Sequence, residues 1–289
     1  MKDADIQTYI RSGVRRGRDT ERVGPFLATF SRHSDNPYLN YAIPADGATP
    51  SPADVAALVA AYQRRGRRPR LEYLPSLAPA VEAALVAAGF TAEGCLPIMV
   101  CTPDSARDLP VPSGIALIAP TSDEEIRAMV SAQNEAYGEG APSAAEVEAR
   151  RANLTAGGLA VLARDVATGE PAGGGICDVP LHETTELAAV GVRPAFRGRG
   201  IAGALTTQLV RDAFARGVTT VFLTPAHDAE ERIYARAGFS RTSEQLHISL
   251  TSTSTTPTLT PEEAVRELAR KRQRDPSANS PLRRQRLPL

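Results

Sequence analysis

Two similar segments, one in each half of the chain, constrain its fold more than any other feature. The first joins a strand-like run, Arg70–Pro75, to a helical run that ends in Leu85–Phe90. The second joins Val221–Pro225 to Tyr234–Phe239 in the same way. Each copy predicts a strand, a proline, a helix closed by glycine and a final strand. Repetition of this unit in the same order indicates a tandem duplication, although a glycine at a helix end is common enough to recur by chance.

The composition is that of an ordinary globular protein and argues against several classes. The 289 residues carry 33 basic and 33 acidic side chains, a balance that argues against a nucleic-acid-binding surface. No apolar run reaches the ~18–20 residues of a membrane span, and the N-terminus lacks the apolar core of a signal peptide. Three cysteines without a CxxC pair and four scattered histidines predict neither disulfides nor a metal site. We therefore expect a cytoplasmic, metal-free protein, and its preference for Arg over Lys, with much Ala and Pro, indicates a bacterial genome rich in G and C.

Hydrophobic periodicity divides the chain into two α/β units and a tail. The first unit, residues 1–103, has predicted strands over 70–74 and 96–101 and predicted helices over 53–65, capped by Ser51, and over 78–88. A proline-rich linker is predicted over 104–114. The second unit, residues 115–250, has predicted helices over 123–137, 144–154, 200–216 and 229–237 and predicted strands over 115–119, 159–164, 174–179, 186–192, 219–224 and 245–250. The tail, 251–289, is rich in Pro, Arg, Ser and Thr and is expected to be mostly disordered, with anchoring to nucleic acid as an alternative.

A glycine-rich turn between a strand and a helix is the strongest chemical signal. Residues 187–192 predict a strand, Pro194 a turn, and Arg197–Gly200 the start of an amphipathic helix. Glycines at such a position let the backbone approach a ligand, and the first N–H groups of the helix, at the positive end of its dipole, bind phosphate or pyrophosphate. The spacing is neither that of a Walker loop nor G-x-G-x-x-G, and Gly173–Gly175 leads into a strand.

These residues resemble a known family. Arg197, Gly200 and Ala202 match R/Q-x-x-G-x-G/A, the acyl-CoA-binding motif of the GNAT superfamily of N-acyltransferases, and Tyr234–Phe239 resembles the end of that family's late helix. The order of predicted elements is similar throughout the second unit. The resemblance implies an α/β fold with a mixed sheet and, together with the repeat, two acyl-CoA N-acyltransferase-like domains in tandem.

The resemblance implies acetyl-CoA as the cofactor, with coenzyme A as co-product. It places the pantetheine arm in a cleft between the strands ending at Val192 and Thr224, paired with the backbone of Val190 and Val192 like an added strand. The candidate cofactor-binding residues are Val190, Gly191, Val192, Arg197, Gly198, Arg199, Gly200, Ile201, Ala202, Gly203, Thr224 and His227. His227 stands where many relatives carry Asn, either as a polar substitute or as an uninvolved loop residue. A solvated turn or a nucleic-acid-binding Arg-Gly run is the alternative for this motif, and the flanking strand and helix favour the cofactor site.

Tyr234 and Glu186 are the candidate catalytic residues. In the family a tyrosine at the place of Tyr234 protonates the departing thiolate, and a phenol with a pKa near ~10 holds that proton at neutral pH. Packing of its ring on the sheet is the alternative. Glu186, which strand alternation places on the face of Ala188, Val190 and Val192, resembles a glutamate that acts as base through water, and an ordinary charged strand end explains it equally well. Weaker candidates for the base are Asp178, Glu183 and Glu135.

The resemblance also implies that the acceptor binds beside the loop between the first two helices of the second unit. The candidate substrate-binding residues there are Asn134, Glu135 and Tyr137. Cys177 is expected to be a buried strand residue, since no base is near it in sequence. The first unit is expected to be a degenerate copy, because Leu85 replaces the tyrosine and no glycine-rich turn precedes its helix.

The sequence therefore predicts an N-acetyltransferase that moves acetyl from acetyl-CoA to a primary amine of a small molecule by direct attack in a ternary complex. Positioning, and polarisation of the thioester carbonyl by backbone N–H groups near residues 190–192, would supply the catalysis. The alternatives are a non-catalytic acyl-CoA-binding sensor or interaction module, and a protein or peptide acetyltransferase. The predicted partner is the amine, with no membrane and no nucleic acid, and the first unit is expected to cover the cleft, form a homodimer or contribute to acceptor binding.

Overall fold

The computed structural model describes residues 2–15, 18–32, 35, 37–225 and 228–250, which form two compact units. Unit 1 comprises the described residues up to 97 together with 243–250, and unit 2 comprises those from 98 to 242. The predicted tail and the candidate residue His227 lie outside the described residues.

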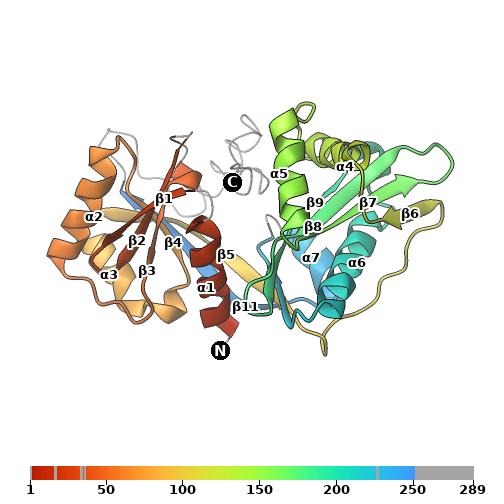
Figure 1. The fold of residues 1–289 in the computed structure, drawn as a ribbon. Coiled ribbons are helices and arrows are strands. Elements are labelled where there is room, and N and C mark those ends of the chain that lie inside the picture. Colours follow the sequence, from red (N-terminus) through yellow and green to blue (C-terminus); the bar gives the residue numbers. More distant parts are fainter. Residues whose placement is uncertain (1, 16–17, 33–34, 36, 226–227, 251–289) are drawn as a thin grey trace. The chain divides into compact units, whose positions relative to one another are not determined.

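Unit 1 is built on a sheet with the strand order β1-β2-β3-β4-β11 (Figure 1). β3 and β4 are parallel, paired at Ala42 and Leu71, and the other neighbouring strands are antiparallel. The strands are β1 Arg18–Val23, β2 Phe26–Ser31, β3 Ala42–Pro44, β4 Arg70–Tyr73 and β11 Ser240–Leu250, and the helices are α1 Lys2–Arg15, α2 Pro52–Arg64 and α3 Pro79–Ala87.

Unit 2 is built on a sheet with the order β5-β10-β9-β8-β7-β6. β9 and β10 are parallel and the other described pairs are antiparallel, so the sheet is mixed as predicted. The strands are β5 Phe90–Cys101, β6 Ile115–Ile118, β7 Leu159–Asp165, β8 Pro171–Cys177, β9 Thr184–Val192 and β10 Thr220–Leu223. The helices are α4 Asp123–Ala136, α5 Ala144–Thr155, α6 Ile201–Ala215 and α7 Asp228–Arg236.

The two copies of the repeated segment exchange their last strands. In sequence, β4-α3-β5 and β10-α7-β11 follow the same order, which confirms the predicted elements. In space, β5 of the first copy pairs with β10, through Met99–Cys101, and β11 of the second copy pairs with β4, through Leu246–Ser249. Each unit is thus completed by a strand that follows the helix of the other copy.

Local capping explains where the helices begin. Ser51, Ser122 and Ser143 each accept a hydrogen bond from the third residue of the following helix, whose acidic side chain bonds back to the serine N–H. These capping boxes satisfy backbone donors that a helix start otherwise leaves without partners. The predicted cap of Ser51 and the predicted start of α4 are confirmed.

The segment predicted to be a linker packs along unit 2. Leu109 N–H donates to Thr207 Oγ1 at 3.3 Å, Arg107 N–H donates to Ala237 O at 3.1 Å, and Asp108 pairs with Arg211 at 2.8 Å. The boundary predicted over 104–114 differs from that of the two compact units, which divide the chain after Pro97 and again before Ser243. The difference arises from the exchanged strands, which cross from one unit to the other.

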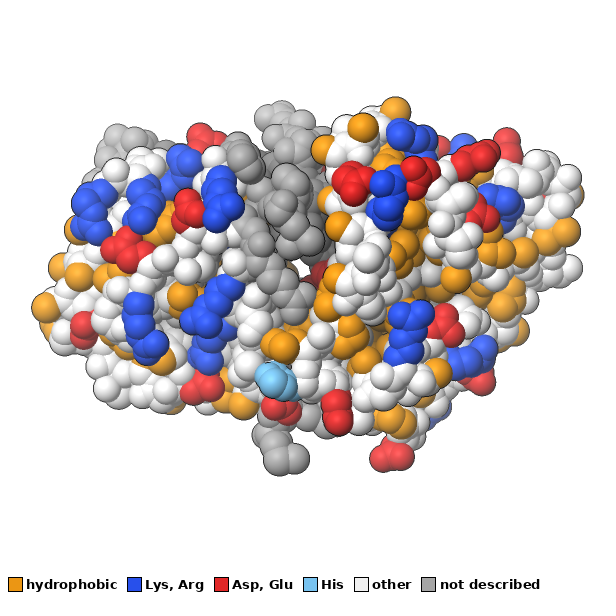
Figure 2. Space-filling view, viewed as in Figure 1, with side chains coloured by type: hydrophobic (Ala, Val, Ile, Leu, Met, Phe, Trp, Pro, Cys, Tyr) orange, Lys and Arg blue, Asp and Glu red, His pale blue; other side chains and the backbone are white. Residues whose placement is uncertain are grey.

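Apolar side chains cover both faces of the sheet in unit 2. One cluster joins α6 to the sheet through residues such as Leu205 and Leu209, and a second joins α4 through Ile126 and Met129. None of the helices in the described part of the chain combines the length and apolar character needed to cross a membrane. On the face shown in Figure 2, basic and acidic side chains are interspersed, as the balanced composition suggests.

Candidate functional site

The parallel ladder between β9 and β10 ends early. Thr220–Phe222 pair with Thr184–Glu186, and among the described residues β10 makes no pair with β9 beyond Glu186. β9 continues to Val192, held on its other side by β8. Because Arg193 N–H donates to Ala172 O, strand alternation turns the N–H of Val192 away from β8. The last part of β9 therefore offers an open backbone edge to an extended ligand.

A β-bulge lies in the middle of this edge. Gly174 pairs with Gly191 and Ile176 with Ala188, so two residues of β9, Ala189 and its neighbour, stand opposite one residue of β8. Ala189 has a φ of +54°, in the left-handed region that a side chain disfavours. The bulge bends β9 beyond the point where its ladder with β10 ends.

The bulge changes which side chains share a face of the sheet. Val190 and Val192 pack with the α6 cluster, whereas Ala188 packs with the α4 cluster. Strand alternation before the bulge puts Glu186 with Ala188 on the α4 side. The prediction that Glu186 shares a face with Val190 and Val192 is therefore wrong, because it assumed an unbroken strand.

Side chains at the C-terminal end of α4 form hydrogen bonds with the bulge. Gln133, which is fully buried, donates from Nε2 to Ala189 O at 2.8 Å, and Tyr137 Oη donates to Val190 O at 3.0 Å. Packing is tight as well, since a Cβ on Gly191 would lie 3.1 Å from Ala136 Cβ. These contacts hold two carbonyls of the bulge against α4.

The turn before α6 presents backbone donors. Gly198 and Gly200 have φ values of +76° and +85°, and Gly200 is the N-cap of α6 without a side chain to cap it. The N–H groups of the first three helical residues, which begin at Ile201, have no partner within the helix, and the first turn carries no acidic residue. Residues 197–200 are exposed. This is the arrangement in which a helix N-terminus binds phosphate.

Tyr234 on α7 packs into the apolar cluster that contains Val190 and Val192. Its ring meets Phe239 edge-on, with ring centroids 6.0 Å apart. Burial, with smaller contributions from the Glu230 carboxylate and the Tyr137 phenol, raises the pKa of Tyr234 well above its usual 10. The phenol therefore keeps its proton at neutral pH.

Residues 126–239, which contain the bulge, the glycine turn and this tyrosine, match a model described as the Acetyltransferase (GNAT) family. These residues are a GNAT acetyltransferase domain. A search among curated proteins gave no significant match.

Solved structures extend the likeness to most of the chain. A GCN5-related N-acetyltransferase from Kribbella flavida is 25% identical, with a TM-score of 0.71, and the match covers 86% of this chain and 96% of that one. A GCN5-related N-acetyltransferase from Sphaerobacter thermophilus has 19% identity and a TM-score of 0.60 over 81% of this chain and 80% of that one. A tandem GNAT protein from the clavulanic acid biosynthesis pathway has 16% identity and a TM-score of 0.58 over 79% of each chain. The fold is therefore that of two acyl-CoA N-acyltransferase-like units in tandem.

The arginines of the glycine turn contact protein groups in the GNAT domain. Arg197 donates from Nε to Val192 O at 3.2 Å and from a terminal nitrogen to Ala136 O at 2.8 Å. Arg199 lies 3.7 Å from an Asp165 carboxylate oxygen. The side chain of Arg197 thus connects the turn to β9 and to the end of α4.

The predicted acceptor residues of the GNAT domain have structural partners. Asn134 is buried and donates to Gly140 O at 2.9 Å, and Glu135 pairs with Arg193 at 2.7 Å. Burial, then the charges of Glu230 and Glu139, raises the pKa of Tyr137, so this phenol also stays protonated. Sequence reasoning missed Gln133 and Glu230, although Glu230 stands four residues before Tyr234 on α7, which puts both on one helix face.

Two weaker candidates for the base have hydrogen-bond partners of their own. Glu183 accepts from Thr219 Oγ1 at 3.3 Å and Asp178 accepts from Asn153 at 2.9 Å. Cys177 is fully buried, and burial raises its pKa far above that of a free thiol, so it is a poor nucleophile. Thr224 follows β10 and is half-buried. Within the residues that the structure describes, no group of His, Cys, Asp and Glu is arranged to hold a metal ion.

Proposed function

We propose that this protein is an N-acetyltransferase that moves acetyl from acetyl-CoA to a primary amine of a small molecule. The observation that carries the proposal is the continuity of a strand edge at Val192, which pairs with no strand of the described residues on that side, with an uncapped helix N-terminus at Gly200. An extended thioester arm fits the first and a diphosphate fits the second. Transfer occurs by direct attack of the amine within a ternary complex.

The residues of unit 2 fit acyl-CoA in shape as well as in charge. No heavy atom of the described residues lies within 4 Å of a Cβ placed on Gly198, so this part of the chain leaves open space beside the turn. The amides from Gly198 to Gly203 hold the diphosphate, and the Val192 N–H pairs with the pantetheine arm. Bound acyl-CoA supplies an activated acyl thioester.

The chain's own residues then handle the protons. The N–H groups at the bulge polarise the thioester carbonyl, and the amine attacks it, so that a C–N bond forms and the C–S bond breaks. Tyr234 donates its phenolic proton to the departing thiolate. Glu186 takes the proton of the amine through water, from the α4 side of β9.

Unit 1 differs at the places that matter for acyl-CoA, so we assign the cofactor to unit 2 alone. The start of α2 is closed by the capping box of Ser51 and Asp54, whose carboxylate would repel a phosphate. Leu85 is fully buried and has no proton to donate. A cytoplasmic location, a homodimer and a role of unit 1 in acceptor binding stay predictions from the sequence.

Calorimetric titration of acetyl-CoA into the wild type and into a Gly198→Glu, Gly200→Glu double variant tests the proposal. The carboxylates block the amides and repel the diphosphate, so we expect micromolar binding to be lost. Gly13→Glu with Val86→Glu adds the same charge at exposed positions of unit 1 and is the matched control.

An amine screen with detection of released thiol follows the titration. Turnover with a small amine supports the proposal, and longer acyl-CoA thioesters define the acyl preference. Unaltered binding in the double variant refutes the assigned site. Binding of acetyl-CoA without turnover of small amines, proteins or peptides identifies a sensor instead.

A further inference from the structure

One face of the sheet in unit 1 is polar although it is buried. Strand alternation places Leu71 and Tyr73 of β4 in the apolar core with α2 and α3, and turns Arg70 and Glu72 to the opposite face. The polar residues buried on the strands of this unit are Arg18, Thr29, Ser31, Arg70, Glu72, Gln245, His247 and Ser249. The acyl-CoA site proposed for unit 2 does not use them.

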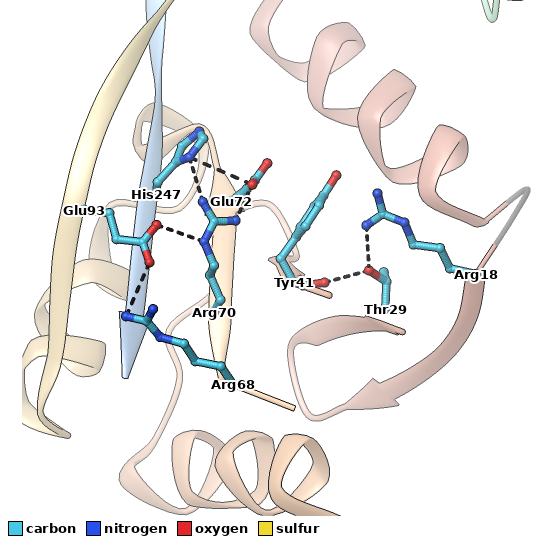
Figure 3. A network of polar contacts seen from close by, with 8 residues as sticks. All are labelled: Arg18, Thr29, Tyr41, Arg68, Arg70, Glu72, Glu93 and His247. Carbon is cyan, nitrogen blue, oxygen red and sulfur yellow. Dashed lines mark hydrogen bonds and ion pairs between the residues drawn. The ribbon is translucent and has the colours of Figure 1, made fainter. Parts of the chain in front are cut away.

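Arg70 shows how this face neutralises a buried guanidinium. It is fully buried, bonds the Glu72 carboxylate, and donates from Nε to Glu93 at 2.9 Å (Figure 3). Its remaining contacts are His247 Nδ1 at 2.8 Å and the Tyr38 ring at 4.5 Å. Two carboxylates thus surround a single positive charge, as burial of an ion requires.

Arg18 is buried on the same unit without such a partner. Only 7% of it is exposed, and it donates to Thr29 Oγ1 at 3.2 Å and lies 4.6 Å from the centre of the Tyr41 ring. No carboxylate of the described residues forms an ion pair with it. Figure 3 shows Tyr41 between Arg18 and the Arg70 network. A hydroxyl and a ring face do not neutralise a guanidinium, so its burial is unfavourable unless an anion joins it.

We propose that Arg18 binds the oxyanion of a small molecule, a carboxylate or a phosphate, beside Thr29 and Tyr41. A guanidinium is a planar fork that matches both groups with two parallel hydrogen bonds. Ser31 lies directly across from Arg18 in the β1–β2 ladder and adds a hydroxyl to this part of the face. Because only 7% of Arg18 is exposed, a ligand contacts it with its anionic end.

The carboxylates of this face pair with arginines other than Arg18. Glu72 and Glu93 both pair with Arg70, and Glu93 also lies 3.7 Å from the exposed Arg68. An anionic ligand would give Arg18 the kind of partner that Arg70 already has, in a unit that carries no acyl-CoA site under the function proposed above.

The test titrates sodium phosphate and sodium acetate separately into the full chain and follows thermal unfolding and calorimetric heat at constant ionic strength. It uses the Gly198→Glu, Gly200→Glu background, in which the start of α6 is blocked, so that its result does not depend on the acetyltransferase proposal. We expect at least one of the two anions to raise the unfolding temperature with saturation. Which of them binds more tightly identifies the ligand as a carboxylate or a phosphate.

Arg18→Met keeps most of the side-chain shape and removes the charge. We expect it to abolish the saturable shift and to leave the anion-free unfolding temperature equal to or above that of the parent, because an unneutralised buried charge is removed. Arg22→Met, at an exposed arginine on the same strand, is the control and retains the shift. Should Arg18→Met fail to fold, Thr29→Val removes the adjoining hydroxyl and is expected to weaken binding.

Two results overturn the proposal. The first is the absence of a saturable effect of either anion on the parent. The second is an equal effect in the parent and in Arg18→Met, which identifies general salt stabilisation. A loss of stability in Arg18→Met without any anion effect assigns Arg18 a structural role against Tyr41.

Discussion

Replacement of Gln133 by methionine tests whether α4 holds the bulge of β9 in its active shape. The Nε2 group of this buried side chain is the donor to Ala189 O, and methionine fills a similar volume without one. A buried carbonyl left without a partner costs ~1–3 kcal/mol. Ala189 already occupies the left-handed region, which costs a residue with a side chain ~1–2 kcal/mol. Gln133→Met therefore favours relaxation of the bulge.

The expected consequence is a fall in turnover rather than in cofactor affinity. Because ~1.4 kcal/mol is a tenfold change, we expect kcat to fall roughly 10–100-fold once an acceptor is known. The dissociation constant of acetyl-CoA should change less than kcat, since the amides before α6, which hold the diphosphate, are untouched. Gln208→Met, a half-buried glutamine on α6 that bonds Asp212 at 2.8 Å, is the control for the chemical change.

A second substitution separates a positioning role from a general loss of packing. Ala189→Gly removes the Cβ that disfavours a φ of +54°, so in the Gln133→Met background it should recover part of kcat. Unchanged kcat in Gln133→Met refutes the reasoning. The reasoning is also refuted if Ala189→Gly changes kcat by the same factor in the wild type and in Gln133→Met, because the glycine then does not relieve strain that the lost hydrogen bond exposes.

Three further outcomes are expected. Tyr234→Phe should lower kcat by about 100-fold or more while leaving the acetyl-CoA dissociation constant unchanged in calorimetry, and equal turnover would exclude it as the acid. Tyr137 and Tyr234 have pKa values raised by burial, so they contribute stability that is complete below pH ~10 and is lost as the pH rises through the folded-state values. Urea unfolding at increasing pH should show this decline, and a smaller one in Tyr234→Phe. A chain ending at Phe239 lacks β11, and the loss of buried Leu246 and Ile248, at ~1.5–3 kcal/mol each, should make unit 1 unfold at lower temperature than in a chain ending at Leu250.

Local chemistry in the sequence was enough to predict the positions of the elements around the site. A serine cap with an acid three residues on marks the start of α2 and of α4 whatever packs around them. Gly200 before an amphipathic run likewise marks the start of α6, because only glycine readily takes the backbone shape found there. The repeated segment predicted two copies of one strand–helix–strand unit, since each copy carries its own periodicity and helix stop.

The N-terminal strands β1 and β2 were not predicted, because their residues do not alternate between apolar and polar. β1 reads as a polar run, and in β2 apolar residues lie beside Thr29 and Ser31, which are also buried. Alternation between apolar and polar positions normally separates an inner face from a solvated one. Here the polar face of unit 1 is itself buried, so hydropathy did not identify it.

Only the tertiary structure decided the partners of the strands and the shape of β9. β5 and β11 each follow a helix of similar sequence, so the local pattern of either strand is compatible with either sheet. In the structure each pairs with the strand of the other copy, β5 with β10 and β11 with β4. The bulge at Ala189 shifts every later side chain of β9 to the opposite face, which a period of two does not anticipate. Pairing and register depend on contacts between residues far apart in the chain, whereas caps and turns depend on neighbours. That is why the sequence located the glycine turn correctly and placed Glu186 on the wrong face.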